Sequence, residues 1–121
     1  MTSIMDHEVL AKSFATGYFS DAQNDVKELH RRYRPDSLLS IDGTKCTGAD
    51  KIGEKLAWFF EDTKTQNIST VSLPFGRDIL MVVTGTMRSG SELGIPVSHT
   101  ILLKSETMTV YIQYHIIAMI T

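Results

Sequence analysis

Apolar positions in the first third of the chain recur with the period of a helix. Leu10, Phe14 and Tyr18 stand four residues apart and would line one face of a first helix. A second amphipathic pattern begins at Val26, and Pro35 should end it because proline disfavours helical geometry at the residue before it. The pattern therefore predicts two helices before residue 36.

One strand and one helix are predicted in the middle of the chain. Ser37–Ile41 reads as a short strand, and the Asp42-Gly43 pair that follows it is a strong local signal for a hairpin turn. A third helix comes after this turn, with an apolar stripe made of Ile52, Leu56, Phe59 and Phe60.

The chain after Asn67 reads as sheet. Three of the four strands expected there are the β-rich runs Ile79–Thr86, Val97–Lys104 and Met108 to the end, and the last two are joined by the short turn Ser105–Thr107. The order α-α-β-α-β-β-β-β predicts a single α+β domain over residues 1–121, with helices on one face of an antiparallel sheet.

The last strand is apolar on both of its sides. One side consists of Val110, Ile112, Tyr114, Ile116, Ala118 and Ile120. The other side consists of Tyr111, Gln113, His115, Ile117 and Met119. An antiparallel sheet covered by helices needs only one apolar side, and a chain this small lacks the helix to cover two. We therefore expect a homodimer packed sheet to sheet, through the second of these sides.

Composition and charge exclude several classes of partner. Hydrophobic residues make up 42% of the 121 residues and charged residues 21%, which is typical of a globular domain. The formal charge of −2 gives no general attraction to phosphate. The one basic cluster falls on a short helical pattern and reads as a solvated face: Lys27, His30, Arg31, Arg32 and Arg34. We expect no direct nucleic-acid partner.

Membrane insertion and disulfide bonding are not expected either. No apolar run approaches membrane-spanning length, and the first residues lack a basic region followed by an apolar stretch. The single cysteine, Cys46, rules out an internal disulfide and fits a reducing compartment. These features predict a soluble protein that stays inside the cell, without a membrane partner.

Side chains that bind metals or nucleotides are scattered along the chain. The four histidines have no close carboxylate spacing or second ligand, which argues against a metal site: His7, His30, His99 and His115. The glycines Gly85, Gly90 and Gly94 are spaced across a hairpin and not between a strand and a helix, so no phosphate loop is indicated. We expect no cofactor.

The middle of the chain resembles a known family. The run SLLSIDGTKCTGADKIGEKL (Ser37 to Leu56) is similar to the signature segment of the nuclear transport factor 2 family, in which a strand, an acidic residue, a turn, a glycine and an I-x-E-K-L helix follow one another. Supporting pieces are KSFATGYF (Lys12 to Phe19), MVVTG (Met81 to Gly85) and HTILLK (His99 to Lys104). The resemblance implies a curved antiparallel sheet wrapped around three helices as an open cone.

The resemblance also implies a function in transport. The family's carriers bind the small GTPase Ran in its GDP form, bind phenylalanine-glycine repeats of nucleoporins, and work between cytoplasm and nucleus at the nuclear pore. On this chain, the acids implied at the rim of the cone are Asp42 and Glu92. The apolar cavity inside that rim would be lined by Ile41, Leu56, Phe59, Ile95 and Ile116.

Two departures from the family pattern keep other functions open. The hairpin that supplies further rim acids in the family reads Arg88 to Leu93 here, with Glu92 as its one carboxylate. The N-terminal tryptophan used for nucleoporin repeats is absent, and the corresponding region reads Asp6-His7-Glu8. The alternative within transport is the related small partner of the mRNA export receptor, which heterodimerises and lacks the rim acid.

An enzyme is the remaining alternative, because ketosteroid-isomerase-like enzymes share the cone. Such an enzyme needs a carboxylate base deep in an apolar cavity, opposite a donor such as a tyrosine. Asp42 stands at a turn, and Tyr18 and Tyr114 read as core residues. We therefore expect binding and no catalysis.

Overall fold

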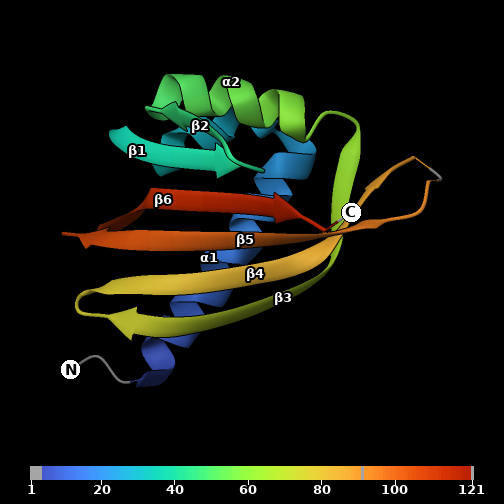
Figure 1. The fold of residues 1–121 in the computed structure, drawn as a ribbon. Coiled ribbons are helices and arrows are strands. Elements are labelled where there is room, and N and C mark those ends of the chain that lie inside the picture. The colour runs from blue at the N-terminus through green and yellow to red at the C-terminus, as the bar shows by residue number, and fades with distance from the viewer. Residues whose placement is uncertain (1–3, 91, 121) are drawn as a thin grey trace.

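Three helices and six strands make up the described part of the chain, residues 4–90 and 92–120, in a computed structural model (Figure 1). The helices are α1 (Ile4–Asn24), the 3-10 helix η1 (Val26–Arg32) and α2 (Ala49–Phe59). The strands are β1 (Tyr33–Ile41), β2 (Thr44–Thr47), β3 (Thr63–Phe75), β4 (Asp78–Ser89), β5 (Ile95–Glu106) and β6 (Thr109–Met119).

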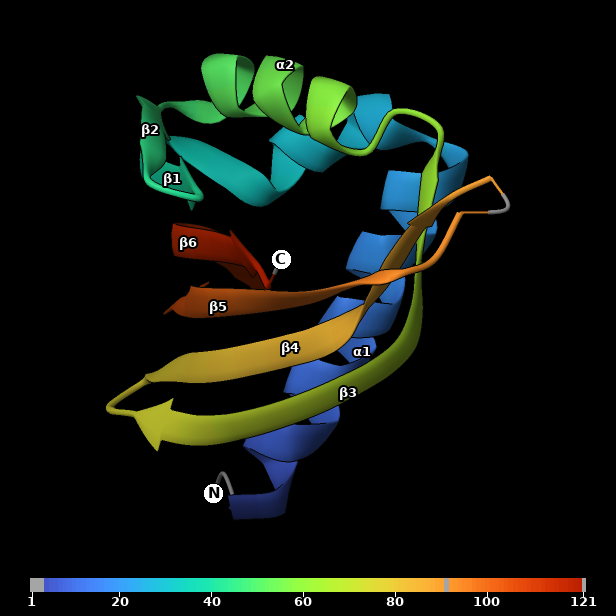
Figure 2. The same cartoon turned by 45° about the vertical axis from the view of Figure 1, so that its right-hand side comes forward.

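The six strands form one curved, open sheet in the order β2-β1-β6-β5-β4-β3. Helix α1 crosses its inner face, while α2 and η1 lie beside β1 and β2 (Figure 2). This confirms the predicted curved sheet around three helices. The sheet is mixed, because β1 pairs with β6 in parallel and all other pairs are antiparallel.

The second helix is shorter than the sequence pattern predicts. It ends at Arg32, and β1 begins at Tyr33, which is 2% exposed and pairs with Ile112. Pro35 therefore lies inside a strand, in an irregular stretch where its missing N–H breaks no regular pairing. The Ser37 hydroxyl bridges this stretch: it accepts the N–H of Arg34 and donates to the carbonyl of Ile112.

A β-bulge reverses the two sides of β6 halfway along its length. Leu103 pairs with Ile112 but Leu102 pairs with Tyr114, so Gln113 is an extra residue. Beyond the bulge, His115 and Ile117 turn inward and are 1% and 0% exposed. Their assignment to the dimer face was therefore wrong.

The same bulge corrects the position of Ile116. Its side chain is 53% exposed and lies on the outer face of the sheet, so its assignment to the cavity was wrong. Met119 also faces inward and packs against the core, so its assignment to the dimer face was wrong. Before the bulge, Tyr111 lies on the side of the strand opposite the buried Ile112. The guanidinium carbon of Arg34 lies 4.7 Å from the centroid of the Tyr111 ring.

Candidate functional site

The turn between β1 and β2 contains the predicted rim acid. Ile41 pairs with Thr44, and the two residues between them have positive φ angles, 46° at Asp42 and 89° at Gly43. Two positive φ angles define the hairpin turn that an Asp-Gly pair favours, since glycine and aspartate tolerate this region better than most residues. The predicted hairpin is confirmed.

The Asp42 side chain connects this turn to the end of β6. Its Oδ1 atom accepts a hydrogen bond from the backbone N–H of Met119 at 3.0 Å, and its own N–H donates to the carbonyl of Ile117 at 3.0 Å. The residue is nevertheless exposed. The carboxylate therefore has a structural contact on one oxygen and faces solvent with the other.

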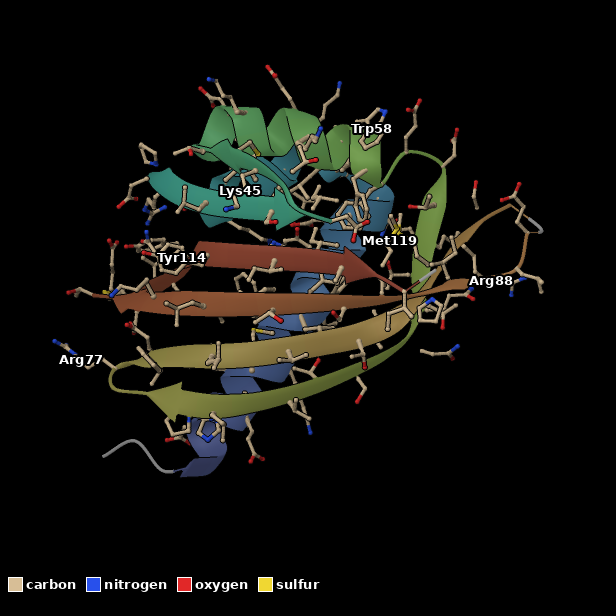
Figure 3. All side chains as sticks on the ribbon, in the orientation of Figure 1. Lys45, Trp58, Arg77, Arg88, Tyr114 and Met119 are labelled. Carbon is tan, nitrogen blue, oxygen red and sulfur yellow. The ribbon has the colours of Figure 1, made fainter. Side chains whose placement is uncertain are left out.

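A pocket of about 570 Å³ opens beside Asp42. We call it the β1–α2 pocket, and it is lined by Ile41, Asp42, Thr44, Lys55, Trp58, Phe59, Glu61, Asp62, Met87, Ser89 and Met119. Ile41 and Phe59 are each 7% exposed and, with the two methionines, give the pocket an apolar floor. Figure 3 shows Trp58 and Met119 at the same end of the molecule, with Arg88 nearby at the end of β4.

The sequence patterns predicted three of the eleven lining residues, and those they missed include Trp58, Glu61 and Asp62. Trp58 is 66% exposed, and the Nζ atom of Lys55 lies 5.2 Å from its ring centroid. Glu61 and Asp62 follow the end of α2 and are exposed. One sequence signal for Trp58 was available, because it stands outside the apolar stripe of α2 and so had to face away from the core.

Three other predicted site residues, Leu56, Ile95 and Glu92, do not line the β1–α2 pocket. Leu56 is fully buried in the core, and Ile95 is 39% exposed at the start of β5, where it pairs with Met87. Glu92 lies in the β4–β5 connection, and its carbonyl accepts the Nε–H of Arg88 at 3.3 Å. Glu92 does not line the β1–α2 pocket.

A chain of four polar side chains crosses the core. The hydroxyls of Tyr18 and Tyr33 lie 2.9 Å apart, and that of Tyr33 lies 2.8 Å from Nδ1 of His115. Nε2 of His115 lies 2.9 Å from Nδ1 of His99. The chain joins α1, β1, β6 and β5, so it fixes the inner face of the sheet against the first helix.

Burial keeps all four groups uncharged at neutral pH. Desolvation lowers the pKa of His99 to about 3. Desolvation, helped by the nearby His99, holds the pKa of His115 well below its usual range. Desolvation also raises the pKa of Tyr18 and of Tyr33 above the ordinary tyrosine value. Among the described residues, the buried polar side chains include no carboxylate that would serve as a base beside these hydroxyls.

The outer face of the sheet carries two rows of side chains that run across five strands and are mostly apolar. One row is Leu73, Leu80, Leu102, Tyr114 and Leu38, and the other is Val71, Val82, Thr100, Ile116 and Ser40. Leu73, Val71 and Ile116 are more than half exposed, at 66%, 64% and 53%. Contiguous apolar area of this kind is typical of an interaction surface. We call these rows the outer apolar face.

Two other kinds of site are not found within the described residues. No group of three or more His, Cys, Asp or Glu side chains there has the geometry of a metal site. None of the helices described is both long and apolar enough to cross a membrane.

Comparison with known proteins places this geometry in context. Residues 10–120 match the family model described as the nuclear transport factor 2 (NTF2) domain. Nuclear transport factor 2 of Candida glabrata is 30% identical over 87 residues, which cover 69% of each chain. The solved structure of nuclear transport factor 2 from Cryptosporidium parvum superposes with a TM-score of 0.87 at 19% identity, covering 99% of both chains. The C. albicans Mtr2-Mex67 M domain complex contains a chain with a TM-score of 0.78 at 12% identity, with 94% of both chains covered.

Proposed function

We propose that this chain, which belongs to the nuclear transport factor 2 domain family, is a transport carrier that acts by binding and not by catalysis. Its cargo would be Ran in the GDP form, and it would work between cytoplasm and nucleus at the nuclear pore. The family relationship supports the class of function. The Ran assignment draws its support from the pocket.

One observation carries the Ran proposal: an acid at the edge of an apolar pocket. Asp42 borders a floor that contains Ile41 and Phe59, and its second carboxylate oxygen is free of the Met119 contact. An apolar side chain of a partner that fills this pocket would exclude water around Asp42. A lysine of the partner would then pair with a partly desolvated carboxylate, which contributes more than an exposed ion pair.

The outer apolar face supports the proposed homodimer. A second copy packed on this face would cover the exposed parts of Val71, Leu73 and Ile116. Grooves along the edge of such an interface would offer apolar contacts to phenylalanine-glycine repeats of nucleoporins. Their binding is proposed together with the dimer.

A capture experiment with nucleotide-loaded Ran tests the proposal. Immobilised wild-type protein should retain Ran-GDP and not Ran-GTP. Asp42→Asn keeps an Oδ1 acceptor for the N–H of Met119 and removes the charge, so it should fold normally and lose most of the capture. Asp42→Lys should abolish it. Equal capture by wild type and Asp42→Asn would contradict the assigned role of the carboxylate.

A second candidate is a subunit that partners an mRNA export receptor. The position of Glu92 favours it, because the β4–β5 connection supplies no carboxylate to the pocket that contains Asp42. If the protein ignores both nucleotide forms of Ran and instead co-purifies with an export receptor, this candidate replaces the Ran carrier.

Enzymatic activity is the least supported function. Tyr18 and Tyr33 form a buried hydroxyl pair, as an isomerase site would need, but their neighbours in the described core are histidines and apolar side chains. Saturable turnover of a steroid-like ketone that is lost in Asp42→Asn would overturn the binding proposal.

A further inference from the structure

We infer that a groove between α1 and the free edge of β3 binds an extended polypeptide segment, which adds to this edge as a further strand and places an acidic group beside Lys12. We call it the α1–β3 groove; it runs between residues 12–24 of α1 and residues 65–70 of β3, with a volume of about 710 Å³. It shares no lining residue with the β1–α2 pocket, so the inference stands apart from the proposed function.

One wall of the groove is a single face of α1. The helical residues that line it recur at steps of three and four positions from Lys12 to Asn24. Ala15 and Phe19 are buried at its base, at 3% and 6% exposed, and exposed hydroxyl and amide side chains follow the rim. The helix rises about 18 Å over this distance, which is the length of about five residues of extended chain.

The other wall is the edge of the sheet. In the described sheet β3 is an end strand that pairs with β4, and α1 passes beside it (Figures 1 and 2). Three consecutive residues of β3 line the groove: Ile68, Ser69 and Thr70. Successive side chains of a strand point to opposite faces, so a groove that touches all three runs along the edge itself. There the strand directs backbone N–H and C=O groups away from the sheet, and an added strand pairs with such groups.

This edge lacks the charges that normally prevent strand addition. No charged residue occurs from Thr65 to Phe75, whereas natural edge strands often carry charged side chains, especially lysine. A β-bulge at Asn67 and Ile68 interrupts the pairing with β4 and leaves further backbone groups unpaired. The edge is therefore open to a partner's backbone.

An unpartnered hydroxyl also lies in the lining of the groove. The Oγ1 atom of Thr65 is buried and has no hydrogen-bond partner within the described part of the chain. Buried polar groups are normally hydrogen-bonded, so this atom indicates a polar occupant.

Lys12 determines the charge of that occupant. It is the one charged residue in the lining of the groove. No ion pair involves it among the described residues, although Glu8 stands one helical turn before it. At the opposite side of Lys12 from the groove, the Nδ1 atom of His7 lies 2.9 Å from Oγ of Ser72 and ties the helix to the strand. An acidic group at this end of the added segment matches the unpaired ammonium.

Amide NMR spectra of the isotope-labelled protein test the inference. The probe is the acetylated, amidated peptide Ser-Val-Ser-Val-Ser-Asp, whose residues include strong strand formers. One control peptide is N-methylated at every residue and so has the same side chains without backbone donors. Ser20→Trp fills the groove, and Ser13→Trp places the same side chain on an exposed part of α1 outside it. Lys12→Glu is compared with Lys51→Glu, which changes an exposed lysine of α2.

We expect saturable shifts at the amides of α1 and β3 that border the groove, and none with the N-methylated peptide. Ser20→Trp should abolish them and Ser13→Trp should keep them. Lys12→Glu should weaken binding about fivefold, as the loss of one exposed ion pair predicts, and Lys51→Glu less than twofold.

The inference is overturned if wild type shows no saturable shift, if the shifts map to another surface, or if both peptides act alike. Sedimentation of Ser20→Trp tests another occupant. A smaller assembly than that of wild type would show that a second copy of the chain covers the groove, and would also overturn the inference.

Discussion

The Nε2 atom of His115 lies 2.9 Å from Nδ1 of His99, and this contact joins two neighbouring strands from inside the core. Both rings are about 1% exposed. The contact exists because the bulge at Gln113 turns His115 inward, so a local irregularity of β6 completes the chain of polar groups that begins at Tyr18.

Acid should destabilise the protein through these two histidines. Desolvation lowers both pKa values, that of His99 to about 3, whereas the unfolded chain binds protons near pH 6.5. Below pH 6.5 the unfolded state therefore holds more protons than the folded state. The free energy of unfolding should fall by roughly 1.4 kcal/mol per pH unit for each histidine that stays neutral.

Urea unfolding between pH 7.5 and 4.5 measures this slope. A His99→Phe variant should show a shallower slope below pH 6.5 than wild type. An unchanged slope in His99→Phe would contradict the neutral buried state.

Tyr33→Phe should destabilise the fold more than Tyr18→Phe. The Tyr33 hydroxyl contacts both Tyr18 and His115, so its removal leaves two buried polar groups without that partner. We expect a loss of about 2–3 kcal/mol for Tyr33→Phe and about 1 kcal/mol for Tyr18→Phe, measured by chemical denaturation. The reverse order would show that the chain of hydrogen bonds is not formed in solution.

Ile116→Lys should separate the proposed dimer without unfolding the chain. Ile116 is 53% exposed within the outer apolar face, and a lysine there would place two charges in a packed interface. Sedimentation at micromolar concentration should show a dimer for wild type and a monomer for Ile116→Lys. Met108→Lys, at a fully exposed position in the β5–β6 turn, should remain dimeric. A monomeric wild type would contradict the proposal.

Asp42→Ala should cost stability that Asp42→Asn does not. Alanine removes the acceptor for the N–H of Met119 and must adopt a positive φ at position 42, whereas asparagine retains an acceptor and tolerates that backbone. We expect a difference of about 2 kcal/mol between the two variants in thermal or urea unfolding. Equal stability would show that the Asp42–Met119 contact contributes nothing.

Local sequence patterns were sufficient for much of the fold. The spacing of Leu10, Phe14 and Tyr18 predicted α1, and the Asp42-Gly43 pair predicted the β1–β2 turn. Each depends on residues within a few positions of one another, where backbone preference and periodic burial act directly. The resemblance of Ser37 to Leu56 to a known family added the curved sheet and the place of Asp42.

Contacts between distant segments were decided by the tertiary structure alone. Asp42 meets Met119 across 77 positions of the chain, and Trp58 lines the same pocket as both. Strict alternation along β6 assigned His115 and Ile116 to the wrong faces, because a bulge arises from pairing with β5 and leaves no periodic trace in one strand. Hydrophobic periodicity therefore determined which segments are helices and strands. Packing between them determined which side chains meet at the pocket.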